Sequence, residues 1–164
     1  MTVTYLSAPA KLTLSLSVVG VRHDGYHLVD AEMVAVNLTD GLEVSDGDGL
    51  EVMAVDGGLE VLEDGENLVA RALRLVGRKV HVMVHKSIPA GAGLGGGSAD
   101  AAAILRWAGW DDVAGSVVLG ADVPFCLIGG RARVTGIGEV VEPLPFEEQV
   151  FTLLTPPVGC PTPD

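Results

Sequence analysis

The sequence of 164 residues is short of positive charge, cysteine and aromatic side chains. It has 10 lysines and arginines against 22 aspartates and glutamates, a formal net charge of −12. Nucleic acid and anionic membranes would repel such a chain, so we expect neither as a non-specific partner. Two cysteines, Cys126 and Cys160, are too few for a disulfide framework or a zinc site. We therefore expect a reduced, cytoplasmic setting.

Long apolar runs are also absent. No uncharged stretch reaches the ~18 apolar residues of a membrane helix, and the long uncharged stretch 87–99 is rich in glycine. The start, MTVTYLSAPAK, lacks the basic-then-apolar pattern of a signal peptide, so none is expected. With 48% hydrophobic and 20% charged residues, the composition predicts a folded domain with one core.

Hydrophobic patterning predicts a β-rich chain with interspersed helices, which is an α+β fold. Alternating Leu12, Leu14, Leu16 and Val18 indicate a half-buried strand after a bend at Pro9. The predicted strands are 3–19 in two pieces, 26–38, a hairpin over 41–55 turning at 47–49, 79–85, 125–134, 139–144 and 151–154. The predicted helices are 67–76, with one apolar face formed by Leu68, Ala72, Leu75 and Val76, then 99–107 and 111–119. The prolines after 155 divide a domain over 1–155 from the start of a linker at 156–164.

A glycine-rich loop, Gly91–Ser98, follows the strand at 79–85 and precedes a predicted helix. Glycines let the backbone approach a ligand closely, and the helix N-terminus adds unpaired N–H groups with partial positive charge. The arrangement predicts a phosphate-binding loop. Ser98 would either cap the helix or contact a phosphate oxygen through its hydroxyl.

The loop has three alternative interpretations. Its spacing, Gly91-x-Gly93-x-x-Gly96, matches the dinucleotide fingerprint, but residues 86–90 separate it from its strand and the doubly wound pattern is missing. A Walker loop is excluded because no Gly-Lys-Ser/Thr follows. The remaining alternative is a flexible loop that holds no ligand.

Four segments resemble motifs of the GHMP kinase family and follow one another in the order found there. They are APAKLTL from Ala8, DGYH from Asp24, PAGAGLGGGSADAA from Pro89 and LGADVP from Leu119. Residues 66–68 and 160–163 are weaker similarities. The resemblance spans essentially the whole chain and implies the N-terminal domain of that family. That domain has a mixed or antiparallel sheet, helices on one side and a left-handed βαβ unit carrying the phosphate loop. It also implies that the family's C-terminal domain is missing.

The same resemblance implies ATP and Mg²⁺, and a small-molecule substrate that carries a cytidine diphosphate group. The reaction would phosphorylate the 2-hydroxyl of its methylerythritol part, in the non-mevalonate isoprenoid pathway. Asp122 would be the base and Lys11 would keep its carboxylate ionised and orient the hydroxyl. From the residues alone, a helix-cap or turn role is favoured for Asp122, and a solvent-facing position is favoured for Lys11.

The resemblance assigns the remaining site residues to two groups, with no metal ligand from the protein. The nucleotide group comprises Asn67, Lys86, Pro89, Gly91, Ala92, Gly93, Leu94, Gly95, Gly96, Gly97, Ser98, Ala99 and Asp100. The substrate group comprises Lys11, Thr13, Tyr26, His27, Asp122 and Thr162. Each of these residues also has a possible structural role without a ligand. Asn67 would be a helix N-cap, Lys86 an exposed strand end, and Asp100 a favourable charge at the helix dipole. Tyr26 would be a core residue and His27 a surface residue.

Two departures from the family pattern bear on function. Thr13 stands where the family usually has asparagine, and the stretch from Trp107 to Asp122 is shorter than usual. Together with the missing domain, they leave three interpretations: the kinase itself, a remnant that binds nucleotide without turnover, and a kinase of another small alcohol. Self-association into a homodimer is also expected, through the apolar face where a second domain would dock.

Overall fold

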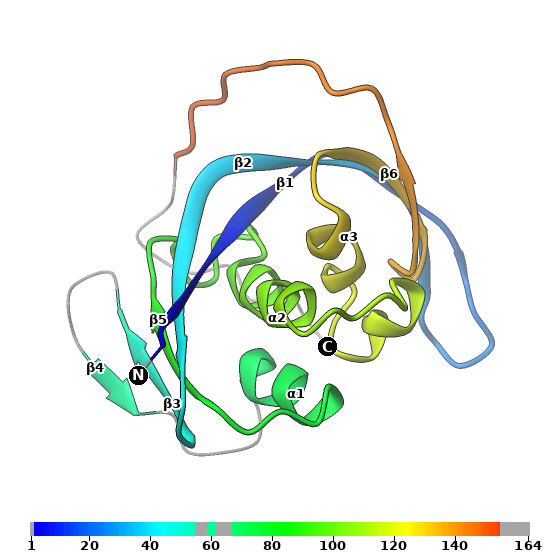
Figure 1. Cartoon of the computed structure of the whole chain (residues 1–164). Coiled ribbons are helices and arrows are strands. Elements are labelled where there is room, and N and C mark those ends of the chain that lie inside the picture. Colours follow the sequence, from blue (N-terminus) through cyan, green and yellow to red (C-terminus); the bar gives the residue numbers. More distant parts are fainter. Residues whose placement is uncertain (1, 55–58, 62–66, 155–164) are drawn as a thin grey trace.

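The computed structural model describes residues 2–54, 59–61 and 67–154 (Figure 1). One mixed sheet curves around the helices, which lie on its concave side (Figure 1). The strands are β1 (Thr4–Val21), β2 (His27–Ser45), β3 (Gly49–Met53), β4 (Leu59–Val61), β5 (His81–His85), β6 (Arg131–Gly136) and β7 (Val140–Pro143). The helices are α1 (Leu68–Leu75), α2 (Gly96–Trp107), α3 (Val123–Ile128) and the 3₁₀ turn η1 (Ala114–Val118). The expected linker at 156–164, with Cys160 and Thr162, lies outside the described residues.

Strand β2 is the central strand of the sheet, because it pairs with three other strands. Along one edge it pairs with β1, and along the other it pairs first with β6, at 29–34, and then with β5, at 41–45. Among the described strands β3 and β5 are parallel, and the other pairs are antiparallel. The α+β class with a mixed sheet is confirmed, and the sheet is not the parallel one that a doubly wound dinucleotide fold requires. The left-handed crossover stays a prediction.

The predicted hairpin over 41–55 is wrong, although the chain does turn at 46–48. Strands β2 and β3 do not pair with each other, because β5 lies between them and pairs with both. Val82 and Val84 of β5 are completely buried, so this strand takes the central position. A turn signal between two strands cannot reveal that a later strand is inserted between them.

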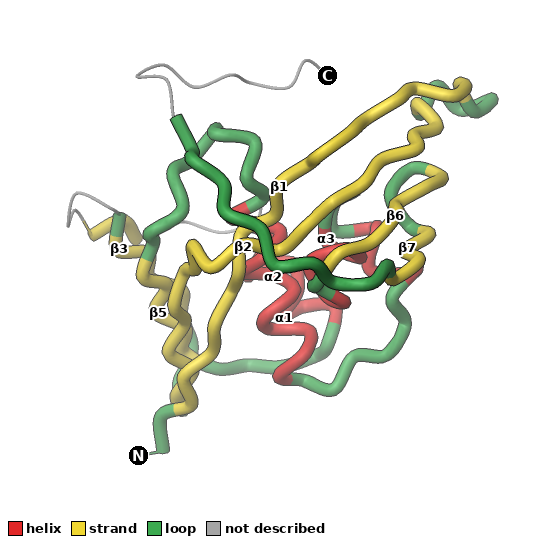
Figure 2. Tube along the Cα trace, turned by 90° about the horizontal axis from the view of Figure 1, so that it is seen from above, coloured by secondary structure: helices red, strands yellow, loops and turns green. Residues whose placement is uncertain are grey.

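Strand β1 also differs from expectation, because it is continuous through Pro9 rather than split into two short strands. The irregularity expected there is present as a register shift between Pro9 and Lys11. The predicted half-buried face beyond it is wrong: Leu16 and Val18 are each 60% exposed. Figure 2 shows why, since the far end of the β1–β2 hairpin extends beyond the helices that would cover it.

Three further predictions of local structure are corrected. The segment 125–134 begins as α3, with Pro124 in the first helical turn where proline is tolerated, and becomes a strand only at Arg131. The segment 151–154 forms no strand. Helix α1 buries Val69, Ala72 and Leu73, whereas Leu75, expected on the buried face, is 36% exposed.

The main core lies between the concave face of the sheet and α2. Residues 99 and 101–103 of α2 are buried alanines, whose small side chains let the helix lie close to the sheet. A second, small cluster of Ala10, Ile88 and Leu94 packs separately from this core, beneath the glycine loop. No helix in the described part of the chain combines the length and apolar character needed to span a membrane.

The contrast between core and hairpin gives a matched pair of variants. Leu42 is 1% exposed, so Leu42→Ala is expected to lower the free energy of unfolding by roughly 2–5 kcal/mol. Leu16→Ala, on the exposed hairpin, is expected to change it by less than about 0.5 kcal/mol. Urea unfolding of both variants checks this, and comparable losses would show that the hairpin end packs into a core.

Candidate active site

Lys11 and Asp122 form an ion pair from elements that are distant in sequence. Lys11 follows the register shift in β1, and Asp122 immediately precedes α3. The Lys11 Nζ lies 3.2 Å from Asp122 Oδ2 and also donates a hydrogen bond of 3.2 Å to Thr13 Oγ1. Lys11 is only 8% exposed, so it is not a solvent-facing lysine, which was the alternative interpretation.

Asp122 occupies the N-cap position of α3, yet its side chain accepts no capping hydrogen bond. The carboxylate instead faces Lys11, and its side chain remains about a third exposed, at 30%. The structure thus combines the two alternatives: Asp122 lies at a helix start, but its carboxylate is available for a role other than capping. A carboxylate beside an ammonium and open to solvent is suited to accept a proton from a hydroxyl.

The glycine loop lies directly against this pair. Gly95 has φ +67°, and a Cβ built on it would be 2.8 Å from Lys11 Cγ and 3.6 Å from Asp122 Oδ2. The backbone adds a further contact, because the Lys11 N–H donates to the Leu94 carbonyl at 2.9 Å. Any other residue at position 95 would therefore displace Lys11 or the loop.

The start of α2 supplies the unpaired donors that a phosphate-binding loop needs. The helix begins at Gly96, and Ala99 donates to the Gly95 carbonyl at 2.8 Å. The N–H groups of Gly96, Gly97 and Ser98 precede this bond and have no acceptor within the helix. A cavity of about 350 Å³ opens beside them, lined by Leu68, Lys86 and residues 88–98.

Not every loop residue is placed to contact a ligand. Ala99 has its N–H bonded to Gly95 and its side chain 1% exposed, while Leu94 is buried in the small cluster beneath the loop. Ser98 is not the helix cap, because that position is held by Gly95. Pro89, Gly91, Ala92 and Gly93 line the cavity, as predicted for the loop. Their contacts with a nucleotide stay a prediction.

Lys86 is neither an exposed strand end nor a free cation beside the loop. Its Nζ is hydrogen-bonded to Asp40 Oδ2 and, at 2.7 Å, to Asp100 Oδ2. Asp40 is 0% exposed, and its other oxygen accepts from the N–H groups of Ser87 and Ile88 at 2.5 and 2.8 Å. This buried cluster of Asp40, Lys86 and Asp100 joins the strand before the loop to the helix after it.

Burial and the neighbouring charges oppose each other in setting the pKa values of this cluster. Desolvation raises the pKa of Asp100 to about 7, although the adjacent Lys86 ammonium opposes the rise. Desolvation lowers the pKa of Lys86, but the two carboxylates outweigh it and leave that pKa raised. The Asp100 Oδ1 is buried without a hydrogen-bond partner among the described residues. Asp100 was expected at the nucleotide or the helix dipole, whereas its observed partner is Lys86.

Two contacts around Asp122 were missed by reasoning from the sequence. A Cβ on Gly138, in the turn between β6 and β7, would lie 2.2 Å from the Ala121 carbonyl, so the turn presses against the residue before Asp122. Gly120 likewise faces Ser98 Oγ, 3.8 Å from its would-be Cβ. The Gly-x-Gly at 136–138 was the only signal in the sequence, and it did not show which segment it touches.

The DGYH turn lies at the far end of the β1–β2 hairpin (Figure 2). Arg22 binds Asp24 through Nε and Nη2, at 2.9 and 2.6 Å, and stacks over the Tyr26 ring at 5.3 Å. The Arg22 hydrogen bonds hold the pKa of Asp24 below its usual value. Tyr26 is 59% exposed and therefore not a core residue.

This turn is not brought next to the ion pair. Lys11 pairs with Ala35 and Val21 with His27, so ten residues of β1 separate the two places. A strand of that length spans at most roughly 35 Å. Asn67 is the N-cap of α1, with Oδ1 accepting from Val69 N at 2.7 Å, and a contact with adenine stays a prediction. Thr162 lies outside the described residues.

Comparisons with known proteins agree with this arrangement. The family model described as GHMP kinases N terminal domain matches residues 67–130, which include the glycine loop and Asp122. A crystal structure of 4-(cytidine 5'-diphospho)-2C-methyl-D-erythritol kinase superposes with a TM-score of 0.66 at 39% identity, covering 86% of this chain and 55% of that one. The chain has the fold of a GHMP kinase N-terminal domain.

Two curated relatives with this fold are named 4-diphosphocytidyl-2-C-methyl-D-erythritol kinase. The protein from Paracoccus denitrificans is 40% identical over 151 residues, covering 92% of this chain and 55% of the relative. The protein from Paramagnetospirillum magneticum is 40% identical over 173 residues, covering 96% of this chain and 61% of the relative. The chain therefore spans somewhat more than half the length of the curated relatives it matches.

The contact between Gly95 and Lys11 can be tested against Gly93, which has φ +72° and nothing within 4 Å of its would-be Cβ. Alanine at either position has the strain of a left-handed backbone, roughly 1–2 kcal/mol. Gly95→Ala is expected to destabilise more than Gly93→Ala, because its methyl group also meets Lys11. Urea unfolding measures the loss of stability in both variants. Equal losses would show that Lys11 does not restrict the size of the residue at position 95.

The raised pKa of Asp100 predicts a pH-dependent stability. Its pKa of about 7 in the folded protein lies above the model value of 3.8. Relative to Asp100→Asn, the wild-type protein should therefore lose free energy of unfolding as pH rises from about 4 to 7. Urea unfolding of both proteins between pH 5 and 8 measures the difference. A difference that stays constant with pH would mean that Asp100 is ionised throughout.

Proposed function

We propose that this chain is the nucleotide-binding and catalytic part of an ATP-dependent kinase that phosphorylates 4-diphosphocytidyl-2-C-methyl-D-erythritol. The observation that carries the proposal is the ion pair of Lys11 and Asp122 against Gly95 of the glycine loop. A hydroxyl at Asp122 would lie beside the N–H groups that bind phosphate. The names of the relatives support the choice of substrate over another small alcohol.

In the proposed reaction Asp122 accepts the proton of the attacking hydroxyl. Lys11 orients the carboxylate through the ion pair, and its hydrogen bond to Thr13 Oγ1 fixes the ammonium in place. Thr13 accepts this hydrogen bond from Lys11 at a position where the family usually has asparagine. The N–H groups of Gly96, Gly97 and Ser98 bind transferring phosphate oxygens, which bear the developing charge.

The residues at the loop fit a nucleoside triphosphate. Gly91, Gly93 and Gly95 all have positive φ, and no side chain occupies the space over Gly93. Among the described residues no three carboxylate, histidine or cysteine groups converge on a common point. We propose that Mg²⁺ arrives with the phosphates of ATP.

Tyr26 and His27 are proposed to hold the cytosine end of the substrate. Tyr26 offers an exposed aromatic face, and the Arg22–Asp24 pair fixes the turn that presents it. Because the turn is a hairpin length away from Lys11, this role requires the hairpin end to bend towards the ion pair when substrate binds. We also expect such an enzyme to be cytoplasmic. Its assembly into a homodimer stays a prediction.

A second candidate is a protein that binds nucleotide without turnover. It is favoured by one observation, namely that ten residues of β1 separate the DGYH turn from Lys11. The two candidates differ in substrate-dependent turnover and share nucleotide binding, so measuring both quantities separates them.

Asp122→Asn tests the proposed base. It should lower kcat by roughly 10²–10⁴-fold, as expected for loss of a general base, with the ATP dissociation constant changed by less than about twofold. Phosphorylated product is followed by ³¹P NMR and ATP binding by calorimetry. Asp111→Asn, at an exposed aspartate, is the control and should be fully active. Loss of ATP binding in Asp122→Asn would make Asp122 a structural or nucleotide-binding residue instead.

Tyr26→Ala tests the cytosine contact. Stacking of a base on an aromatic ring contributes about 1–3 kcal/mol, so the KM for the cytidine substrate should rise roughly tenfold or more while the KM for ATP is unchanged. Tyr5, which is 74% exposed near the other end of β1, gives the matched control Tyr5→Ala. Steady-state kinetics with each substrate varied decide it: a similar rise for ATP, or none for the cytidine substrate, counts against the role.

A further inference from the structure

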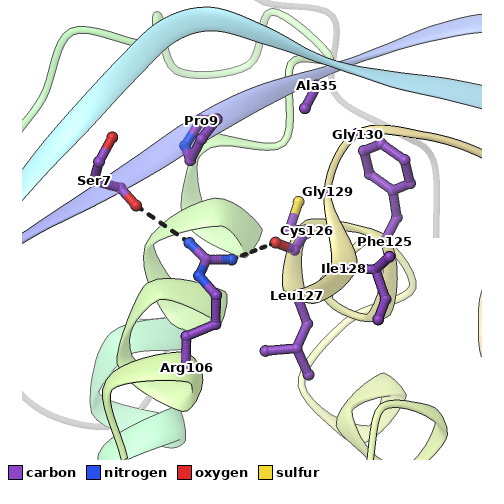
Figure 3. Close-up of a pocket in the computed structure, with 10 residues that line it drawn as sticks. All are labelled: Ser7, Pro9, Ala35, Arg106, Phe125, Cys126, Leu127, Ile128, Gly129 and Gly130. Carbon is purple, nitrogen blue, oxygen red and sulfur yellow. Dashed lines mark hydrogen bonds between the residues drawn. The ribbon is translucent and has the colours of Figure 1, made fainter. Parts of the chain in front are cut away.

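Arg106, in the last turn of α2, joins three elements of the fold. Its Nη1 donates to the Cys126 carbonyl of α3 at 2.5 Å, and its Nη2 donates to the Ser7 carbonyl of β1 at 3.2 Å (Figure 3). Arg106 forms no ion pair with a carboxylate in the described part of the chain. Its guanidinium is therefore directed at two backbone oxygens rather than at a charged partner.

Both acceptors belong to the segments that carry the ion pair. Ser7 precedes Lys11 by four residues on β1, and Cys126 follows Asp122 by four residues in α3. The Cys126 N–H donates to the Asp122 carbonyl at 3.0 Å, so the turn held by Arg106 is hydrogen-bonded to Asp122 itself. A cation near the end of α3 also complements the partial negative charge of its carbonyls.

The polar contacts of Arg106 add to the packing at this junction. Residues of α2, α3 and β1 share the main hydrophobic core. A pocket of about 320 Å³ also opens between them, with Pro9, Phe125 and Ile128 among its walls (Figure 3). Beside this space, the two hydrogen bonds of Arg106 join α2 to the backbones of β1 and α3. At the opposite end of α2, Gly95 touches Lys11 and Asp122.

We propose that Arg106 is a positioning residue that sets the separation of Lys11 and Asp122 by tying the backbones of β1 and α3 to α2. The kinetic consequence rests on the proposed function, whereas the geometric consequence does not. Loss of the two bonds frees α3 to shift against β1, and the coupling between Lys11 and Asp122 then weakens.

A double-mutant cycle measures that coupling without reference to activity. Lys11→Met, Asp122→Asn and their combination are unfolded in urea, in the unaltered chain and again together with Arg106→Met. The coupling free energy is expected to fall at least twofold in the Arg106→Met background. Arg71→Met is the matched control, because the Arg71 guanidinium also donates to a carbonyl, that of Val118 in η1 at 2.7 Å, but has no hydrogen bond to β1 or α3 among the described residues. The coupling should be unchanged there.

A coupling equal in the unaltered and Arg106→Met backgrounds would overturn the proposal, as would an equal loss with Arg71→Met. If Arg106→Met does not fold, Arg106→Lys replaces it. Lysine keeps the charge but cannot bridge both carbonyls with a planar fork, so the same loss of coupling is expected.

Kinetics give the second readout. Arg106→Met should lower kcat at least tenfold with the KM for ATP changed less than twofold, and Arg71→Met should lower neither. An unchanged kcat alongside a lost coupling would overturn the positioning role. If the unaltered chain shows no turnover, the proposed function fails, and the coupling measurement alone decides the role of Arg106.

Discussion

The site depends on one close approach, that of the Gly95 backbone to Lys11 and Asp122. The absence of a side chain at position 95 lets the first turn of α2 rest on the ion pair, at a would-be Cβ distance of 2.8 Å from Lys11 Cγ. This contact brings the unpaired N–H groups of the loop next to the side chain of Asp122. A loop that binds phosphate and a base that activates a hydroxyl are useful to each other only at such a distance.

The surrounding structure holds that contact from several sides. The buried cluster of Asp40, Lys86 and Asp100 fixes the loop where it leaves β5 and where it enters α2. The turn at Gly138 presses against the residue before Asp122. Breaking a buried ion cluster by removing one member costs far more than an exposed pair contributes, so the loop is held rigidly at both ends. Rigid supports of this kind keep reacting groups aligned.

Local motifs selected residues that the fold brings together, whereas the arrangement of the strands was harder to predict. Lys11, Asp122 and the glycine loop were identified because their motifs are short and local, and the structure brings them together. The insertion of β5 between β2 and β3, and the start of α3 within a predicted strand, depend on long-range packing that local patterns do not contain. The ion pair of Lys86 with Asp40 was not predicted either, since no local signal shows that Asp40, distant in sequence, is its partner. A contact of Lys86 with a nucleotide stays a prediction.

The most direct measurement of the central claim is ADP release by the 164-residue chain with magnesium and ATP, with and without 4-diphosphocytidyl-2-C-methyl-D-erythritol. The account predicts release that depends on this alcohol, because Asp122 can activate only a hydroxyl placed beside the loop. Release that is unchanged by the alcohol, or ATP bound without any release, would contradict it and leave the chain as a nucleotide-binding protein.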